Sequence, residues 1–345
     1  MDEPTSRHTE IIAVDPAAPD GAAVARAAAV LRAGGLVAFP TETVYGLGAD
    51  ALNAAAVRRI FAAKGRPAFN PLIVHVPDTA AAQELVTTWP ELAARAAAAF
   101  WPGPLTLVLP KRVAVPAEVT AGLDTVGVRV PSHPVALALL RAAGIPVAAP
   151  SANLFTRVSP TTAAHVIDAL RGRVDVVVDG GATPLGIEST VLDLSVAQPV
   201  LLRPGIIGID ELEPVLGPVA ASARPDAGDT HDADAGSARR SPGMLERHYS
   251  PAARLVLFDT PARGAHEAAT ARAAGHRVGA LVRHSFTGAA DEVLVLPDDA
   301  AGYARLLYAS LHALDDGGCG VVLVEAPPAG PHWEAVRDRL ARAAG

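Results

Sequence analysis

The sequence predicts an α/β protein of two domains: a twisted mixed sheet with flanking helices, followed by a small Rossmann-like α/β domain. Three observations support this prediction. Short apolar runs alternate with helix-like segments over residues 18–212, a polar segment follows, and a second alternation fills residues 252–345. Such alternation is typical of folds in which helices cover a sheet. With 345 residues, 50% of them hydrophobic, the chain is long enough to build both cores.

The first domain is expected to begin after a polar tail at residues 1–17. Residues 21–32 read as a helix that ends at Gly34 and Gly35, and Asn53 is a suitable N-cap for a helix over 53–63. Other helices are expected at 79–87, 90–99, 134–143 and 161–171. Strands are expected at 36–40, 71–76, 104–109, 125–130, 145–149, 174–178, 189–194 and 199–203.

Residues 213–251 are expected to form a partly disordered linker, since residues 221–240 contain no large apolar residue and are rich in Asp, Ala, Gly and Ser. In the second domain, strands are expected at 254–258, 278–282, 292–296 and 320–325, and helices at 261–274, 299–314 and 332–343. No Gly-x-Gly-x-x-Gly follows its first strand, which argues against a dinucleotide site.

Composition excludes several classes of protein. The net charge of -7 argues against a dominant basic surface, so any contact with nucleic acid has to be local. No apolar run reaches membrane-spanning length without an interruption by Arg, Gly or Pro, and the first ten residues are too polar for a signal peptide. A cytoplasmic protein is therefore expected. The single cysteine, Cys319, cannot form a disulfide within the chain or a zinc site of several thiolates, and the histidine spacing indicates no metal site.

The segment KGRPAFNPL has more polar and rigid residues than a simple helix-to-strand loop requires. A helix end accounts for Lys64 and the glycine after it, but it does not account for Arg66, Asn70 or the two prolines. Loops carry functional residues more often than regular elements do. The segment is therefore a candidate part of a binding site.

Four more segments place polar residues beside strands. They contain Thr43, Arg129 on the same strand face as Thr125, the serine and asparagine at 151 and 153, and the Ser189 segment with Arg203. Each has an ordinary structural explanation, such as a turn, an exposed charge or, for Ser159, a helix N-cap. Together, however, cations at several strand ends favour an anionic ligand, carboxylate or phosphate. No P-loop sequence is present.

These segments, in their order, resemble a known family. FPTETVYGLGADA, KGRPAFNPL, WPGPLTLVL, GVRVPSHP, APSAN, ESTVLDL and LLRPG are similar to the motifs of the YrdC-like L-threonylcarbamoyladenylate synthases, over residues 20–210. The segment SPGMLERHYSP at 241–251, with the residues after it, resembles the two-domain form of that family, which has a C-terminal accessory domain.

The resemblance implies a nucleotidyltransferase. It would form L-threonylcarbamoyl-AMP and pyrophosphate from L-threonine, bicarbonate and ATP, with Mg²⁺ expected to be carried by ATP. The product would serve the N6-threonylcarbamoyladenosine modification of tRNA beside the anticodon, after a separate threonylcarbamoyl transferase complex has received it. Whether the protein itself contacts tRNA is left open.

The resemblance also implies roles for residues. Threonine would be bound by Thr43, His75, Arg129, Ala149 and Ser189. ATP would be bound by Arg66, Asn70, Thr125, Ser151, Asn153, Ser159, Arg203, His248 and Tyr249, with Lys64 and Arg66 stabilising phosphate. Residues 241–251 would then be an active-site lid that excludes water from the adenylate. We find no candidate for a covalent nucleophile.

Two other functions remain as alternatives. One is a double-stranded RNA-binding module without adenylate synthesis, although the net charge of -7 weighs against strong sequence-independent binding. The other is the carbamoyl-transfer enzyme of hydrogenase maturation, which contains a similar domain. That enzyme has zinc fingers, which a single cysteine cannot build.

Overall fold

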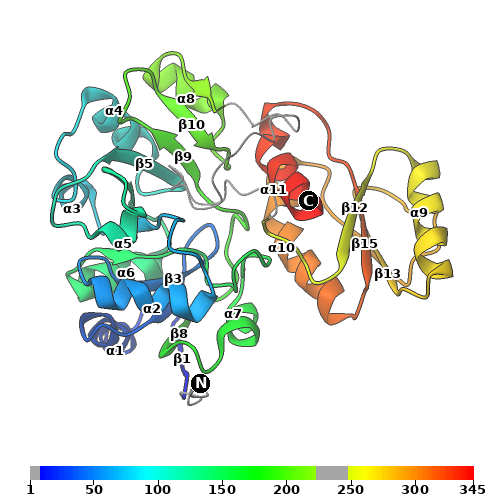
Figure 1. Ribbon diagram of the computed structural model, residues 1–345, viewed down its shortest axis with the longest axis horizontal. Helices are drawn as coiled ribbons and strands as arrows, with labels where there is room; N and C mark the ends of the chain where they lie inside the picture. Colours follow the sequence, from blue (N-terminus) through cyan, green and yellow to red (C-terminus); the bar gives the residue numbers. More distant parts are fainter. Residues whose placement is uncertain (1–7, 223–247) are drawn as a thin grey trace.

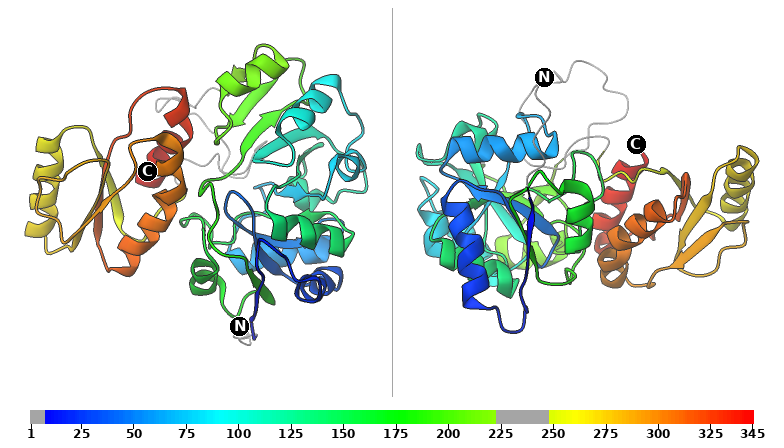
Figure 2. Two further views of the ribbon diagram at one scale, coloured as in Figure 1. Left: turned by 180° about the vertical axis from the view of Figure 1, so that it is seen from behind. Right: turned by 90° about the horizontal axis from the view of Figure 1, so that it is seen from below.

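The computed structural model describes residues 8–222 and 248–345. These residues form two parts, each built on its own sheet, and the parts lie side by side in every view (Figures 1 and 2). Within each part, strands and helices alternate along the chain. The predicted α/β class, with a large mixed sheet and a smaller second α/β unit, is therefore confirmed.

The large sheet contains the strands β1 (Glu10–Ala13), β2 (Val37–Pro40), β3 (Tyr45–Asp50), β4 (Ile73–His75), β5 (Leu105–Pro110), β6 (Thr125–Arg129), β7 (Val147–Ala148), β8 (Val176–Asp179), β9 (Thr190–Asp193), β10 (Val200–Arg203) and β11 (Ala220–Ala221). Their order across the sheet is β1-β8-β2-β3-β7-β4-β6-β5-β9-β10-β11. The parallel pairing of β4 with β6 sets His75 opposite Arg129. The sheet register thus brings together two residues that lie far apart in the sequence.

The helices of the first part are α1 (Gly21–Arg32), α2 (Ala54–Lys64), α3 (Thr79–Gln83), α4 (Glu91–Phe100), α5 (Ala117–Thr120), α6 (Pro134–Ala143), α7 (Ala163–Leu170) and α8 (Ile209–Leu216). In α2, the Asn53 side chain accepts hydrogen bonds from the backbone N–H groups of residues 55 and 56, and Gly65 ends the helix at φ +62°. The chain therefore leaves α2 at a defined point, directly before Arg66.

Apolar cores lie on the two faces of the large sheet. One core joins α1 and α6 to β1, β2 and β8, and it buries Leu31, Phe39 and Leu139. The other joins α2, α4, α5, α7 and α8 to the opposite face and buries Ile60 and Leu107. Full burial of one such side chain stabilises the fold by about 1.5–3 kcal/mol, so the two cores hold the strand ends in fixed positions.

The second part contains β12 (Arg254–Phe258), α9 (Pro261–Ala273), β13 (Val278–Val282), β14 (Glu292–Val295), α10 (Ala300–Asp316), β15 (Val321–Glu325), a 3₁₀ turn (Pro331–Trp333) and α11 (Glu334–Ala344). Its strands are parallel, in the order β12-β15-β13-β14. In Figures 1 and 2, α10 and α11 face the first part and α9 lies on the far side. Cys319 is free and buried just before β15.

The two parts share an apolar core. It packs Val44 and Ile187 of the first part against Tyr249, Tyr308 and Leu311 of the second. Gly186 has φ +76°, and a Cβ atom there would lie 2.4 Å from the backbone oxygen of Arg305 in α10. A helix of the second part therefore approaches this loop more closely than any side chain would permit.

The structure corrects several details of the sequence prediction. Residues 10–13, expected in a polar tail, form β1 and pair with β8, because Ile12 and Val14 reach the core beside α1. Residues 213–221, assigned to the linker, complete α8 and supply β11, which pairs with β10. The segment at 40–48, for which a turn was one interpretation, continues into β3 from Tyr45. The helix expected over 79–87 ends at Gln83.

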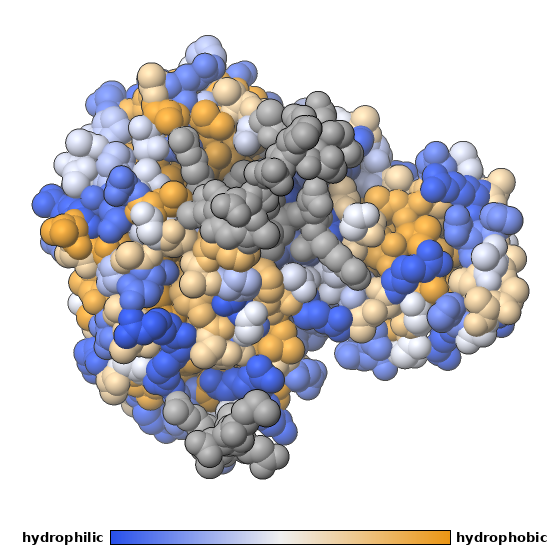
Figure 3. All heavy atoms as spheres, in the orientation of Figure 1, coloured by the Kyte–Doolittle hydropathy of each residue, from blue (hydrophilic) through white to orange (hydrophobic). Residues whose placement is uncertain are grey.

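The remaining linker, and residues 241–247 of the expected lid, lie outside the described residues. Within the part of the chain that is described, no helix is long and apolar enough to span a membrane. Figure 3 shows hydrophilic and hydrophobic residues interspersed over the visible face, as is usual for a globular protein.

Candidate active site

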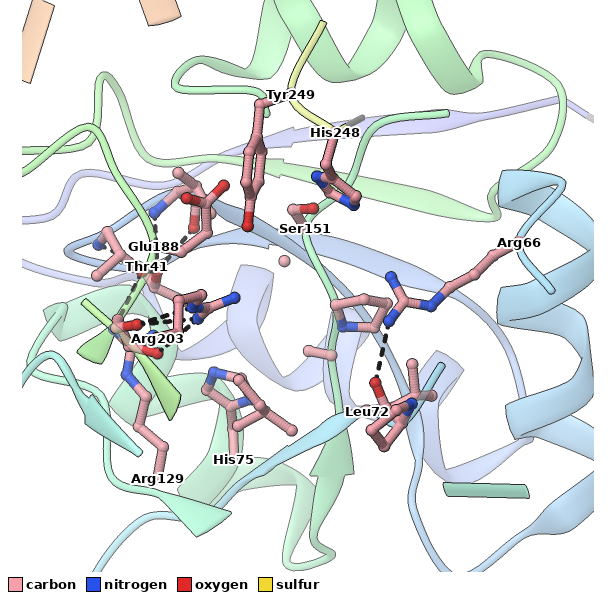
Figure 4. A pocket seen from close by; sticks show the side chains of 18 residues that line it. Thr41, Arg66, Leu72, His75, Arg129, Ser151, Glu188, Arg203, His248 and Tyr249 are labelled. Carbon is pink, nitrogen blue, oxygen red and sulfur yellow. Dashed lines mark hydrogen bonds between the residues drawn. The ribbon is translucent and has the colours of Figure 1, made fainter. Parts of the chain in front are cut away.

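A cavity opens among the strand ends of the large sheet, beside Tyr249 (Figure 4). It contains about 540 Å³ of empty space, its open mouth included. The lining residues are Thr41, Thr43, Val44, Gly46, Arg66, Pro71, Leu72, Ile73, His75, Arg129, Ala149, Pro150, Ser151, Glu188, Ser189, Arg203, His248 and Tyr249. Segments that are distant in the sequence thus meet around one space.

All five residues predicted for threonine line this cavity: Thr43, His75, Arg129, Ala149 and Ser189. Five of those predicted for ATP also line it: Arg66, Ser151, Arg203, His248 and Tyr249. The remaining predicted residues lie outside the lining: Lys64, Asn70, Thr125, Asn153 and Ser159.

Lys64 lies behind the cavity wall and contacts the backbone there. It is 2% exposed, and its ammonium group donates hydrogen bonds to the backbone oxygens of Ser151 and Asn153. Burial, with Arg66 nearby, holds the pKa of Lys64 well below its ordinary value. The contacts of this lysine therefore hold the loop after β7 in place.

The other predicted residues outside the lining have separate surroundings. Asn153 donates from its side chain to the backbone oxygens of residues 154 and 157, at 2.7 and 2.8 Å. Thr125 is half-buried at the start of β6. Both polar atoms of the buried Asn70 side chain lack a hydrogen-bond partner among the described residues. These two atoms are polar groups in the 64–72 loop that a ligand could satisfy.

Arg129 extends from the end of β6 into the cavity wall and is 3% exposed. Its Nη2 donates to Glu42 Oε1 at 2.7 Å and to Thr43 Oγ1 at 3.1 Å, while its Nε donates to the Gly103 backbone oxygen at 3.2 Å. Glu42 Oε2 is buried without a partner in the described structure. Sequence reasoning missed Glu42, which fixes the orientation of the guanidinium group.

Arg203 lies at the end of β10 beside Ser189. Its Nε and Nη2 donate to the Ser189 backbone oxygen at 3.1 and 3.0 Å, and Nη2 also donates to Ser189 Oγ at 3.1 Å. The hydroxyl of Ser189 lies 2.8 Å from that of Thr106 on β5. The arginine and the serine are thus fixed to each other within the wall.

Glu188 lines the cavity and, like Glu42, is an acidic residue that sequence reasoning missed. Its Oε1 accepts from Ser159 Oγ at 2.5 Å, and its Oε2 accepts from Tyr308 and Arg339 of the second part at 3.0 and 2.7 Å. Burial raises the pKa of Glu188, but Arg339 and Arg203 outweigh it and hold that pKa below its usual value. Ser159 therefore contacts the cavity wall through Glu188.

His248 and Tyr249 close one side of the cavity. Tyr249 adopts φ +62°, its ring stacks on that of Tyr308 at 5.9 Å, and its hydroxyl has no hydrogen-bond partner among the described residues. The backbone N–H of His248 donates to the Arg342 backbone oxygen of α11 at 3.0 Å. The second part thus holds both aromatic rings at the cavity.

Burial lowers the pKa of three basic side chains in the lining. Burial and the nearby Arg129 lower the pKa of His75 from 6.5 to about 3, so its imidazole is neutral at pH 7. Burial lowers the pKa of Arg66 to about 10, which leaves its guanidinium charged. Burial, together with Arg66 and Lys64, also holds the pKa of His248 well below its ordinary value.

The fold and the cavity together define a class of protein. Three buried arginines, several hydroxyls and strand-end backbone groups surround one space that can hold a small molecule bearing phosphate or carboxylate groups. Such a site is typical of α/β enzymes that bind an anionic substrate.

Comparison with known proteins identifies the family within this class. Residues 29–205 match the family model for Sua5, YciO and YrdC proteins, described as telomere recombination, and residues 207–345 match the threonylcarbamoyl-AMP synthase C-terminal domain. The chain belongs to the threonylcarbamoyl-AMP synthase family, in its two-domain form.

Relatives and a solved structure agree with this assignment. The threonylcarbamoyl-AMP synthase of Pyrococcus abyssi is 44% identical, over 92% of this chain and 93% of the relative. That of Bacillus subtilis is also 44% identical, over 93% of each chain. The structure of P. abyssi Sua5 complexed with L-threonine matches at 42% identity and a TM-score of 0.90, over 97% of this chain and 98% of that one.

Proposed function

We propose that this protein is a threonylcarbamoyl-AMP synthase, a nucleotidyltransferase that uses L-threonine, bicarbonate and ATP. The observation that carries the proposal is one cavity lined by Arg66, Arg129 and Arg203 together with Thr43 and Ser189. Family membership over nearly the whole chain supports the same reaction.

In this proposal, the threonine lies in the half of the cavity next to Arg129. The guanidinium group pairs with the substrate carboxylate, and Glu42 keeps that guanidinium oriented through its 2.7 Å hydrogen bond. Thr43 and Ser189 offer hydroxyl groups to the polar end of threonine. The neutral His75 contributes a hydrogen-bonding ring without adding charge.

ATP occupies the other half, where Arg66 and Arg203 pair with its phosphates and Ser151 contacts the nucleotide. Asn70, whose side-chain atoms lack partners, is available for a nucleotide hydrogen bond. Lys64 and Asn153 act indirectly, because their hydrogen bonds hold the loop after β7. Ser159 acts through its hydrogen bond to the Glu188 carboxylate. Mg²⁺ enters with ATP as its phosphate complex, because phosphate oxygens are ligands that Mg²⁺ prefers.

The reaction then needs positioning more than a nucleophilic side chain. The threonine amine and bicarbonate form a carbamate with loss of water. A carbamate oxygen bonds to the α-phosphorus of ATP, and the bond from that phosphorus to the β-phosphate bridging oxygen breaks and releases pyrophosphate. Arg66 and Arg203 stabilise the charge that develops on the phosphates, and the in-line placement of the two substrates supplies much of the acceleration.

The test is pyrophosphate release from ATP by the purified protein, with and without L-threonine and bicarbonate, in the presence of Mg²⁺. We expect release to require both co-substrates and to fall at least a hundredfold in Arg66→Ala and Arg129→Ala. The exposed arginine of α4, in Arg95→Ala, is the control and should leave the rate unchanged. ATP left intact under every condition would overturn the proposal, and would direct attention to RNA binding.

The product would serve tRNA N6-threonylcarbamoyladenosine formation in the cytoplasm, through a separate threonylcarbamoyl transferase complex. An adenylate of this kind is a mixed anhydride, so its consumer must be an enzyme that transfers the acyl group. Incubating the reaction mixture with such a transferase and unmodified tRNA tests this step. Modified adenosine should form only when the synthase is present.

A further inference from the structure

One cation of the second part reaches three segments of the cavity wall. Arg339 of α11 is fully buried. Its Nε donates to Glu188 at 2.7 Å, its Nη2 donates to the Pro204 backbone oxygen at 3.0 Å, and its guanidinium carbon lies 5.1 Å from the centre of the Tyr249 ring. A single side chain, Arg339, therefore contacts Glu188, Pro204 and Tyr249.

The carboxylate held by Arg339 lies near Arg203, a cation that is expected to bind phosphate. Glu188 precedes Ser189, whose backbone and hydroxyl oxygens accept from Arg203. A buried carboxylate that loses its counterion seeks the nearest remaining cation, since an unpaired buried charge is very costly. Arg203 is the cation of the cavity lining that interacts electrostatically with Glu188.

Accordingly, we propose that Arg339 is a positioning residue for ATP, by which the second part keeps the Glu188 carboxylate from pairing with Arg203. This inference rests on the proposed function. Without Arg339, Glu188 competes with the phosphates for Arg203 and places an uncompensated negative charge in the lining, where it repels ATP. Ser159 and Tyr308 fix the carboxylate further, and neither group neutralises its charge.

The test compares four proteins: the full-length wild type, Arg339→Met, Glu188→Gln and the double variant. Methionine keeps an apolar chain against Tyr249 while it removes the charge. We expect Arg339→Met to raise KM for ATP at least tenfold, with a smaller change in KM for threonine. The double variant should recover KM for ATP to within about threefold of wild type, because the neutral amide has no need of a counterion and Asp338, the other carboxylate that Arg339 contacts, keeps its contact with Arg342.

Each outcome decides the matter. If KM for ATP rises in Arg339→Met and stays high in the double variant, Arg339 only supports the fold and the inference is wrong. An unchanged KM for ATP in Arg339→Met also contradicts the inference. Arg283→Met is the matched control, because it removes a second-part cation that pairs with Glu325 and Asp298 at 2.7 Å. Arg283→Met should lower thermal stability without changing KM for ATP. A wild type that releases no pyrophosphate would instead refute the proposed function.

Discussion

Individual residues of the site fall into two groups, according to whether the sequence identified them. The hydroxyls and arginines at strand ends are recognisable as candidates because several of them occur together, although each alone has an ordinary structural explanation. Glu42 and Glu188 were not, because carboxylates were unexpected in a site for anions. They are there as counterions and orienting groups, which only the spatial neighbours of each arginine reveal. The backbone contacts of Lys64 were hidden from the sequence for the same reason.

The buried His75 makes a pH-dependent contribution to stability. Its pKa is lowered to about 3, whereas the unfolded imidazole has the ordinary value of 6.5. Between these values the unfolded state binds more protons, so stability is lost as the pH falls, by about 1.4 kcal/mol per pH unit.

We therefore expect His75→Gln to lose less stability than wild type between pH 7 and pH 5, by about 2 kcal/mol. Urea unfolding at the two pH values measures this difference. The exposed histidine at 276 is the control, and His276→Gln should retain the wild-type dependence. Equal losses in wild type and His75→Gln would show that the ring is not buried as a neutral group.

Elements were predictable where several local signals agreed. For α2, an N-cap asparagine, an apolar stripe and a terminal glycine indicate the same helix, and the structure agrees to within a residue. By contrast, β1 is only four residues long, and β11 only two, and both gain their stability from pairing with distant strands. The threonine and glycine residues around β3 resemble a turn when the neighbouring strands are unknown.

The packing of α10 against the Gly186 loop can be tested by substitution of this glycine. Gly186→Ala would combine the strain of φ +76° with a Cβ atom 2.4 Å from a backbone oxygen. Gly144 has φ +64° and open space around it, so Gly144→Ala measures the strain alone. We expect a cost of about 1–2 kcal/mol for the control and at least about 2 kcal/mol more for Gly186→Ala. Equal costs in chemical denaturation would mean that α10 is not packed against this loop.

For the whole molecule, the core shared by the two parts predicts cooperative unfolding. Val44 and Ile187 pack with Tyr308 and Leu311 in one apolar cluster, so neither part can lose its structure without exposing the other. Calorimetry should show a single transition. A non-hydrolysable ATP analogue at 100 times its Kd should shift that transition upward, by about 2.7 kcal/mol in stability. Two separate transitions, only one of them sensitive to the analogue, would contradict this expectation.

The solitary thiol of Cys319 makes the protein convenient for spectroscopy. It is 5% exposed, and burial raises its pKa, so maleimide reagents should leave it unmodified in the folded protein. Val113 and Val295, on the first and second parts, are 99% and 60% exposed. Cysteines introduced at these two positions would accept a pair of fluorophores without any need to remove the native residue. Energy transfer between the dyes would then report, in solution and during turnover, whether the distance between the two parts changes as substrates bind.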